Sequence, residues 1–351
     1  MSEARRPQPR PAISMNFQFY TAAIAGTPKL SVDGTVENAI HFSHWKGNET
    51  TASVKADTST EIVLNVVASP SRNELTKGID LVTNNHFDTD GVLSVWTMLN
   101  GERATRLSDK LIAGAEAGDF SEFSSVDGVR SSILIQGSDS PIDKSGSPIA
   151  RQLAGEEVND EARAYDLVLP HVEDLLTNTS KYEALWRPSW VRIERALNSF
   201  AKDASRVDED APPRLSVVML APEVFGPDGF DPSRDAAPFT AISYHARGEL
   251  FLIATPLEKG WAYRIDYPYY SWADTVVRPK IVRRELNGLM NELNELESNS
   301  TGKWKVDSSE LASAAKFSDE NGKLAVSMLR ADLVASHLRN GLVESTKAMT
   351  P

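Results

Sequence analysis

IDLVTNNHFDTDGVLSVW, residues 79–96, is the stretch that decides the fold. An apolar run at 79–82 leads into a polar cluster, and Gly91 then opens a second apolar run that ends at Trp96. This order predicts a strand, a short polar loop and a helix that stops near Asn100 and Gly101. In an open α/β sheet such a loop lies beyond the carboxyl end of its strand, where ligands bind.

The polar loop carries the side chains His86, Asp88 and Asp90. Carboxylate oxygens and imidazole nitrogens are suitable ligands for a divalent cation, so we predict that these three residues are both metal ligands and catalytic residues. The alternative is a capped turn in which Asp90 is the N-cap of a helix that begins near Gly91. That alternative leaves His86 and Asp88 unexplained.

The run HFDTDG, residues 86–91, resembles the first motif of the DHH-type phosphoesterases. The resemblance implies a parallel sheet that presents His86, Asp88 and Asp90 to two manganese or magnesium ions, with Asp119 as a further acidic ligand. The chain departs from that family because it has no Asp-His-His tripeptide. As a whole it also resembles an uncharacterised bacterial family of unknown function that shares the HFDTDG run.

The segment just before this stretch, residues 41–61, is rich in polar side chains. His41 and His44 are our candidates for the missing metal ligands, and the site would hold one ion, use these replacements or hold none. The alternative is a strand whose histidines form local hydrogen bonds, followed by an Asx or ST turn.

Composition narrows the class of protein. The 351 residues carry a net charge of −12 and no cysteine, which disfavours nucleic acid as a partner and excludes thiol chemistry. No apolar run reaches the roughly 18 residues of a membrane span. Residues 1–12 are basic and proline-rich and lack the apolar segment of a secretory signal, so we expect a disordered tail and a cytoplasmic protein without membrane contact.

Periodicity along the chain predicts an α/β fold with two domains, residues 13–210 and 211–351. The first is a mainly parallel sheet with flanking helices, and the second is an α+β portion with an antiparallel meander. Predicted strands cover 61–67, 215–220, 239–244, 250–255 and 261–267, and residues 207–214 form a break. Predicted helices cover 104–117 with Gly118 as C-cap, 161–178, 182–203 and 283–297, and another starts at Ser308.

Aromatic and basic residues alternate in the segment 263–284. Arg264, Arg278 and Tyr267 are our candidates for substrate binding, because arginine pairs with anionic groups and rings stack on planar ones. The alternative is a strand edge packed at a domain seam.

These observations together predict a metal-dependent hydrolase, a phosphoesterase that acts on a small anionic or nucleotide-like substrate with Mn²⁺ or Mg²⁺. No nucleophile elbow, P-loop, G-x-G-x-x-G or H-E-x-x-H motif points to another mechanism. The alternative is a non-catalytic ligand-binding or regulatory protein that keeps a degenerate metal loop. Nucleic-acid processing would require a basic groove beside the loop.

Overall fold

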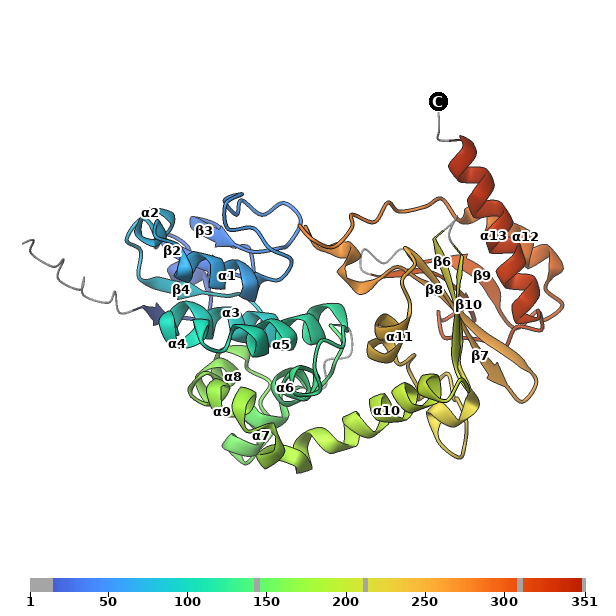
Figure 1. Ribbon diagram of the computed structural model, residues 1–351, viewed down its shortest axis with the longest axis horizontal. Coiled ribbons are helices and arrows are strands. Elements are labelled where there is room, and N and C mark those ends of the chain that lie inside the picture. Colours follow the sequence, from blue (N-terminus) through green and yellow to red (C-terminus); the bar gives the residue numbers. More distant parts are fainter. Residues whose placement is uncertain (1–14, 142–145, 211–213, 308–311, 349–351) are drawn as a thin grey trace, which may run out of the picture.

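The computed structural model describes residues 15–141, 146–210, 214–307 and 312–348. Figure 1 shows two lobes, an N-terminal one and a C-terminal one, bridged by the long helix α10 (Glu183–Ala201). The predicted tail and the predicted helix start at Ser308 lie outside the described residues.

The N-terminal lobe is built on a parallel four-stranded sheet in the order β1-β4-β2-β3. The strands are β1 (Asn16–Phe17), β2 (Lys29–Val32), β3 (Ala39–Phe42) and β4 (Leu81–Thr83). Leu30 of β2 lies opposite Val82 of β4 and Ile40 of β3. Because the strands are parallel, the loops that follow β2 and β4 meet at one edge of the sheet.

Helices surround this sheet and bury most of the apolar side chains of the lobe. They are α1 (Ser59–Ala68), α2 (Arg72–Thr76), α3 (Thr89–Asn100), α4 (Glu102–Thr105), α5 (Ser108–Phe120), α6 (Val126–Gln136), α7 (Pro148–Ala154), α8 (Glu161–Val168) and α9 (Val172–Thr177). The order strand, loop, helix predicted for residues 79–100 is confirmed by β4 and α3, and Gly101 is the C-cap of α3.

The predicted strand at 61–67 is wrong, because these residues belong to α1. The Thr58 side chain accepts a hydrogen bond from Glu61 N and caps the helix at its start. Val63 and Val66 are fully buried in the N-terminal core. Packing of the helix therefore overrides the strand preference of its β-branched residues.

The helix predicted at 104–117 is divided into α4 and α5, and it does not end at Gly118. Helix α5 continues to Phe120 and ends at Ser121, which has a left-handed backbone (φ 49°). Gly118 instead allows α5 to approach α3, because a Cβ there would lie 2.6 Å from Thr89 Cβ. Asp119 is therefore in the last helical turn, where its direction is fixed.

The C-terminal lobe is built on a six-stranded mixed sheet in the order β5-β6-β7-β8-β10-β9. The strands are β5 (Arg206–Asp210), β6 (Leu215–Met219), β7 (Leu250–Leu257), β8 (Gly260–Asp266), β9 (Lys303–Val306) and β10 (Ser313–Ser318). Strands β7, β8, β10 and β9 are antiparallel to their neighbours, so the antiparallel part of the prediction is confirmed with β7 and β8 as its predicted members, and β6 is parallel to β7. The helices are α11 (Phe239–His245), α12 (Asn287–Leu296) and α13 (Ala331–Ala348). The predicted α/β class with an α+β C-terminal portion is confirmed.

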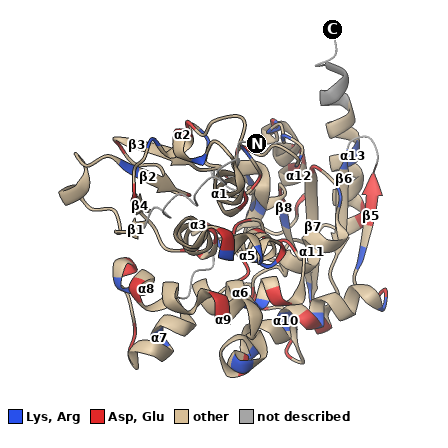
Figure 2. Ribbon diagram, turned by 60° about the vertical axis from the view of Figure 1, so that its left-hand side comes forward, with Lys and Arg blue, Asp and Glu red and all other residues tan. Residues whose placement is uncertain are grey.

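Two predictions in this lobe are wrong. The break expected at 207–214 begins with β5, an acidic strand that pairs antiparallel with β6 at the edge of the sheet (Figure 2). Charged side chains are tolerated there because an edge strand is half solvated. Residues 239–244 form helix α11 and not a strand, and the buried Phe239, Ala241 and Ile242 pack against the sheet through one core cluster.

The remaining predicted helices are confirmed with shifted ends. Residues 161–178 contain α8 and α9, residues 182–203 contain α10, and residues 283–297 contain α12. The division into domains at residue 210 stays a prediction. None of the described helices has the length and apolar character that a membrane crossing requires.

Candidate metal centre

Two groups of acidic and histidine side chains meet at the edge of the parallel sheet. The first group is Asp33, His44, Asp90 and Asp119, and the second is Asp33, His86 and Asp88. Within each group one ligand-type atom per residue lies within 4.8 Å of all the others. The two groups share Asp33 and are therefore adjacent.

Asp33 follows β2 directly, at the carboxyl end of a central strand. Its backbone has φ 64°, a conformation that non-glycine residues rarely adopt and that aspartate tolerates better than most. The carboxylate is fully buried, and Oδ1 accepts a hydrogen bond from Ser59 Oγ at 2.9 Å. Oδ2 makes no hydrogen bond to any residue that the structure describes and remains available to a ligand.

Both histidines are held by their Nδ1 atoms. His44 Nδ1 lies 2.7 Å from the carbonyl oxygen of Asp57, and His86 Nδ1 lies 3.0 Å from Asn85 Oδ1. A carbonyl oxygen only accepts hydrogen bonds, so each Nδ1 carries a proton and each Nε2 faces the carboxylates. A histidine that ligates a metal through Nε2 usually has its Nδ1 proton held by an oxygen atom in this way.

The Nε2 atoms lie close to several carboxylate oxygens. His44 Nε2 is 3.1 Å from Asp119 Oδ2, 3.7 Å from Asp33 Oδ1 and 3.8 Å from Asp90 Oδ2. His86 Nε2 is 2.8 Å from Asp33 Oδ2 and 3.1 Å from Asp88 Oδ2. Neither Nε2 has the angular geometry of a hydrogen bond to these oxygens. The donors therefore surround shared space instead of pairing with one another.

The helix N-termini orient two of the aspartates. Asp90 accepts hydrogen bonds from Ser59 N and Thr60 N, both at 2.7 Å, at the start of α1. Asp88 accepts one from Gly91 N at 2.9 Å and is the N-cap of α3. The alternative that placed Asp90 at this cap is therefore wrong, because the first turn of α3 directs Asp90 toward α1.

The carboxylates and imidazoles perturb one another strongly. Burial alone would lower the pKa of His44, but the charges of Asp119, Asp90 and Asp33 outweigh it and raise this pKa to about 10. Burial also lowers the pKa of His86, yet Asp88 and Asp33 bring it well above its usual value. Burial and the neighbouring Asp88 raise the pKa of Asp119 to about 6. Without a cation the centre therefore retains protons that a bound cation would displace.

The two groups differ in their access to solvent. The side chains of Asp33, His44 and Asp90 are fully buried, and that of Asp119 is 5% exposed. The His86 side chain is 20% exposed and that of Asp88 is 9% exposed. The first group is therefore closed, whereas the second opens toward the surface.

A strap from the C-terminal lobe, residues 269–278, covers the closed group. The Trp272 ring meets the His44 ring edge-on at 5.0 Å, and Asp274 N donates to the His44 carbonyl at 2.7 Å. The Asp57 carboxylate accepts hydrogen bonds from the backbone nitrogens of residues 276–278. Arg278 completes the connection through ion pairs with Asp57, Glu116 and Glu122.

The other predicted site residues lie in different places. His41 Nε2 bonds to the Val36 carbonyl and belongs to neither group. Arg264 pairs with Asp266 within the C-terminal sheet, and the Tyr267 hydroxyl accepts a hydrogen bond from Arg284 N in the core of that lobe. Arg278 belongs to neither group and contacts the centre indirectly, through Asp57, whose carbonyl holds His44, and through the Phe120 ring, which packs against His44.

Asp33, the residue shared by the two groups, was missed from the sequence. Its Asp-Gly pair is a common turn signal, and the strand before it has only four residues. The one usable signal is its position after a short strand-like run, which in a parallel sheet places it at the same edge as residue 84.

No curated protein and no solved structure matches the chain. The resemblance of residues 86–91 to the DHH-type phosphoesterases stays a prediction. The wider resemblance is supported by a family model that matches residues 15–323 and so covers both lobes. The chain belongs to that family, DUF6687, a family of unknown function.

Proposed function

We propose that this protein is a metal-dependent hydrolase, a phosphoesterase that uses two divalent cations. One observation carries the proposal: two groups of acidic and histidine donors share Asp33, and both imidazoles are oriented with Nε2 toward the carboxylates. Such a shared carboxylate is expected where two cations lie side by side, as in two-metal hydrolases.

Charge supports the same proposal. The centre contains the carboxylates of Asp33, Asp88, Asp90 and Asp119, and all four residues are buried. Buried carboxylates repel one another and lose hydration, so they are costly without a compensating charge. Two divalent cations would balance four carboxylates. The mixture of oxygen and imidazole donors suits Mn²⁺, and Mg²⁺ is the alternative for a more hydrated site.

Divalent cations in such a centre supply Lewis acidity, which activates water and stabilises charge on a phosphoryl oxygen. The chain itself would hold the cations, exclude water from the closed group and leave the His86 side open to a small substrate. The Trp45 ring, 40% exposed and 5.4 Å from the His86 ring, flanks that opening. Arg278 is engaged with three carboxylates, so neutralisation of the substrate is expected to come mainly from the cations.

Metal content tests the first half of the proposal. The full chain, stripped with EDTA, loaded with Mn²⁺ and desalted, should retain close to two ions by mass spectrometry of the metal. Asp33→Asn should lose both, whereas Asp88→Asn should lose mainly the ion of the open group. His41→Ala is the matched control, because this histidine lies outside both groups and should not alter the metal content.

Catalytic turnover tests the second half of the proposal, the phosphoesterase activity. The Mn²⁺-loaded chain should hydrolyse an aryl phosphomonoester or phosphodiester, and His86→Ala and Asp88→Ala should abolish this activity while His41→Ala keeps it. Two bound ions without turnover in such a panel would favour the alternative, a non-catalytic binding protein. Loss of neither metal nor activity in the Asp33, His86 and Asp88 variants would overturn the proposal.

A further inference from the structure

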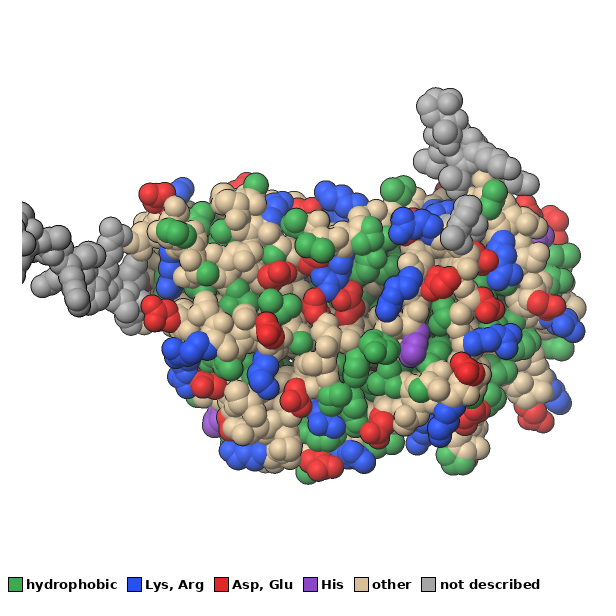
Figure 3. Space-filling view, in the orientation of Figure 1, with side chains coloured by type: hydrophobic (Ala, Val, Ile, Leu, Met, Phe, Trp, Pro, Cys, Tyr) green, Lys and Arg blue, Asp and Glu red, His purple; other side chains and the backbone are tan. Residues whose placement is uncertain are grey.

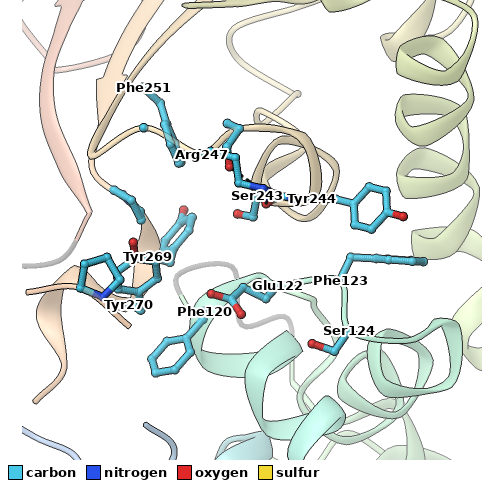
Figure 4. Close-up of a pocket in the computed structure, with 14 residues that line it drawn as sticks. Phe120, Glu122, Phe123, Ser124, Ser243, Tyr244, Arg247, Phe251, Tyr269 and Tyr270 are labelled. Carbon is cyan, nitrogen blue, oxygen red and sulfur yellow. Dashed lines mark hydrogen bonds between the residues drawn. The ribbon is translucent and has the colours of Figure 1, made fainter. Parts of the chain in front are cut away.

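A cavity of about 430 Å³ lies at the seam of the two lobes, away from the carboxylates of the metal centre. Figure 4 shows that side chains from the end of α5 and from the loop after it face side chains from α11 and from the strap. None of the six residues of the metal groups lines this cavity. It is therefore a feature that the proposed hydrolysis does not use.

Aromatic rings from both lobes form the walls. Phe123 of the N-terminal lobe meets Tyr244 of α11 edge-on at 5.2 Å, and Phe120 meets Tyr270 of the strap edge-on at 6.3 Å. Tyr269 and Phe251 add to the C-terminal side. Rings that face a cavity of this size favour a flat, apolar guest, which can stack or meet them edge-on.

The polar side chains of the cavity include one arginine, Arg247, and several hydroxyl groups. Arg247 Nη1 donates only to the carbonyls of Ser243 and Ala246, and no carboxylate of the described residues lies within ion-pair distance of its guanidinium. The one carboxylate of the lining, Glu122, is neutralised by Arg278 at 2.5 Å. Burial and the charge of Glu122 raise the pKa of Tyr270 to about 12, so its hydroxyl keeps its proton at neutral pH. A guanidinium without a carboxylate partner among the described residues, beside hydroxyl groups, favours an anionic group on the guest.

A wall of packed side chains separates this cavity from the metal groups. The Phe120 ring lies 5.6 Å from the His44 ring, and the Arg278 guanidinium lies 4.9 Å from the centre of the Phe120 ring. Phe120 is fully buried and follows Asp119 directly. A guest in the cavity would thus contact Phe120, which packs against His44, and would not reach the metal ligands themselves.

We propose that this cavity, the seam cavity, is a binding site for a planar aromatic anion, separate from the metal centre. The aromatic walls would hold the ring, and Arg247 would pair with the charged group at the open edge. This inference stands independently of the proposed hydrolase activity, because none of its residues is a metal ligand.

Three small probes test the proposal on the full chain by isothermal titration calorimetry. Naphthalene-2-sulfonate has both the ring and the charge, 2-naphthylmethanol has only the ring, and cyclohexanesulfonate has only the charge. We expect saturable binding of the first, weaker binding of the second and none of the third. Absence of saturable binding of naphthalene-2-sulfonate at millimolar concentration would overturn the proposal, as would equal binding of all three probes.

Variants locate the site. Arg247→Gln should weaken binding of naphthalene-2-sulfonate about tenfold, since a hydrogen-bonded charge pair is lost, and should leave 2-naphthylmethanol unchanged. Phe123→Leu should weaken both aromatic probes. Arg206→Gln, which changes an exposed arginine outside the cavity, is the matched control and should have no effect. An unchanged affinity in Arg247→Gln contradicts the proposal even if the probe binds.

The metal centre serves as the second control. Asp88→Asn and EDTA treatment should leave naphthalene-2-sulfonate binding within about twofold of the untreated chain. If either abolishes binding, the probe occupies the metal centre and the seam cavity is not its site. If hydrolysis is absent in every assay but these binding results are obtained, the proposed hydrolase activity is rejected and the proposed binding site in the seam cavity is supported.

Discussion

Gly91 illustrates how closely the polar loop and α3 are packed. A Cβ at this position would lie 2.4 Å from Asn84 Nδ2 and 2.8 Å from the Tyr165 hydroxyl. Asn84 and Tyr165 are hydrogen-bonded to each other, and the Tyr165 hydroxyl donates to the His86 carbonyl. The glycine therefore maintains the network that supports His86.

We expect Gly91→Ala to lower the free energy of unfolding by about 1–3 kcal/mol, because the added methyl group forces a packed network apart. Urea denaturation with circular dichroism measures this change. Gly288→Ala in α12 is the control, since nothing lies within 4 Å of a Cβ there, and it should stabilise the chain by up to about 1 kcal/mol. Equal effects of the two substitutions would contradict this account of Gly91.

Asp174 in α9 gives a prediction about pH. Hydrogen bonds from Lys181, Tyr182 and Asn178 hold the pKa of Asp174 at about 2, below its ordinary value. A lowered pKa in the folded state stabilises the fold above the ordinary pKa near 4, and this contribution disappears as pH falls toward 2. The difference in free energy of unfolding between the native chain and Asp174→Asn should therefore be constant from pH 5 to 7 and shrink below about pH 4. A constant difference down to pH 2.5 in urea titrations would contradict it.

At the scale of elements, the strap joins the C-terminal lobe to the metal centre. Arg278 has 17% of its side chain exposed and pairs with three carboxylates that belong to the N-terminal lobe. Removal of its charge leaves those carboxylates partly buried without their partner, which commonly costs several kcal/mol.

We expect Arg278→Met to release the strap. Hydrogen exchange of the amides at 276–278, which donate to Asp57, should become at least tenfold faster, because the ion pairs that hold the strap are lost. Lys280→Met is the matched control, since the side chain of this lysine is 81% exposed and its Nζ lies 3.7 Å from Asp274 Oδ1. Such an exposed ion pair contributes little to stability. Exchange that is equally slow in both variants would show that the backbone hydrogen bonds alone hold the strap.

Elements were predictable from the sequence where local signals and packing agreed. The apolar runs around residues 84–91 identify β4 and α3 because a strand, a polar loop and an amphipathic helix each have their own spacing. Helix α1 was missed because its β-branched residues favour a strand, and only its buried environment decides for the helix. Strand β5 was missed because an acidic run resembles a loop until its pairing with β6 is known.

Five of the six residues in the two groups were candidates from the sequence, and three of these five are local in sequence. His86, Asp88 and Asp90 stand within five residues, so their type and spacing are visible directly. Asp119 was a candidate through the family resemblance and Asp33 was missed, because strand order and helix packing bring both residues to the loop and no local pattern encodes these contacts. His41 and His44 lie three residues apart, and only the turn after β3 determines that His44 alone faces the carboxylates.

At the scale of the whole molecule, the proposed cations should stabilise the folded N-terminal lobe, because they would link several of its elements. Their ligands come from the ends of β2 and β3, from α3, from α5 and from the loop after β4. A ligand at 100 times its dissociation constant stabilises the folded state by about 2.7 kcal/mol. We therefore expect saturating Mn²⁺ to raise the melting temperature by about 5 °C or more in differential scanning calorimetry.

This stabilisation should be absent in Asp33→Asn and present in His41→Ala, which keeps every member of both groups. A rise of the same size in Asp33→Asn would mean that Mn²⁺ acts elsewhere on this acidic chain. The charged side chains visible in Figure 3 are of mixed sign, so weak general binding of cations should saturate at much higher concentration.

Helix α10 restricts how the two lobes can move relative to each other. Its first half, with Trp186, Trp190 and Ile193, belongs to the core of the N-terminal lobe, and its second half, with Ala196 and Phe200, belongs to a core cluster of the C-terminal lobe. The helix is therefore anchored in the hydrophobic core of each lobe. A hinge motion that widened the seam would have to bend this helix or detach one end of it from its core, so a ligand of the seam cavity should enter at the open edge beside Arg247, without separation of the lobes.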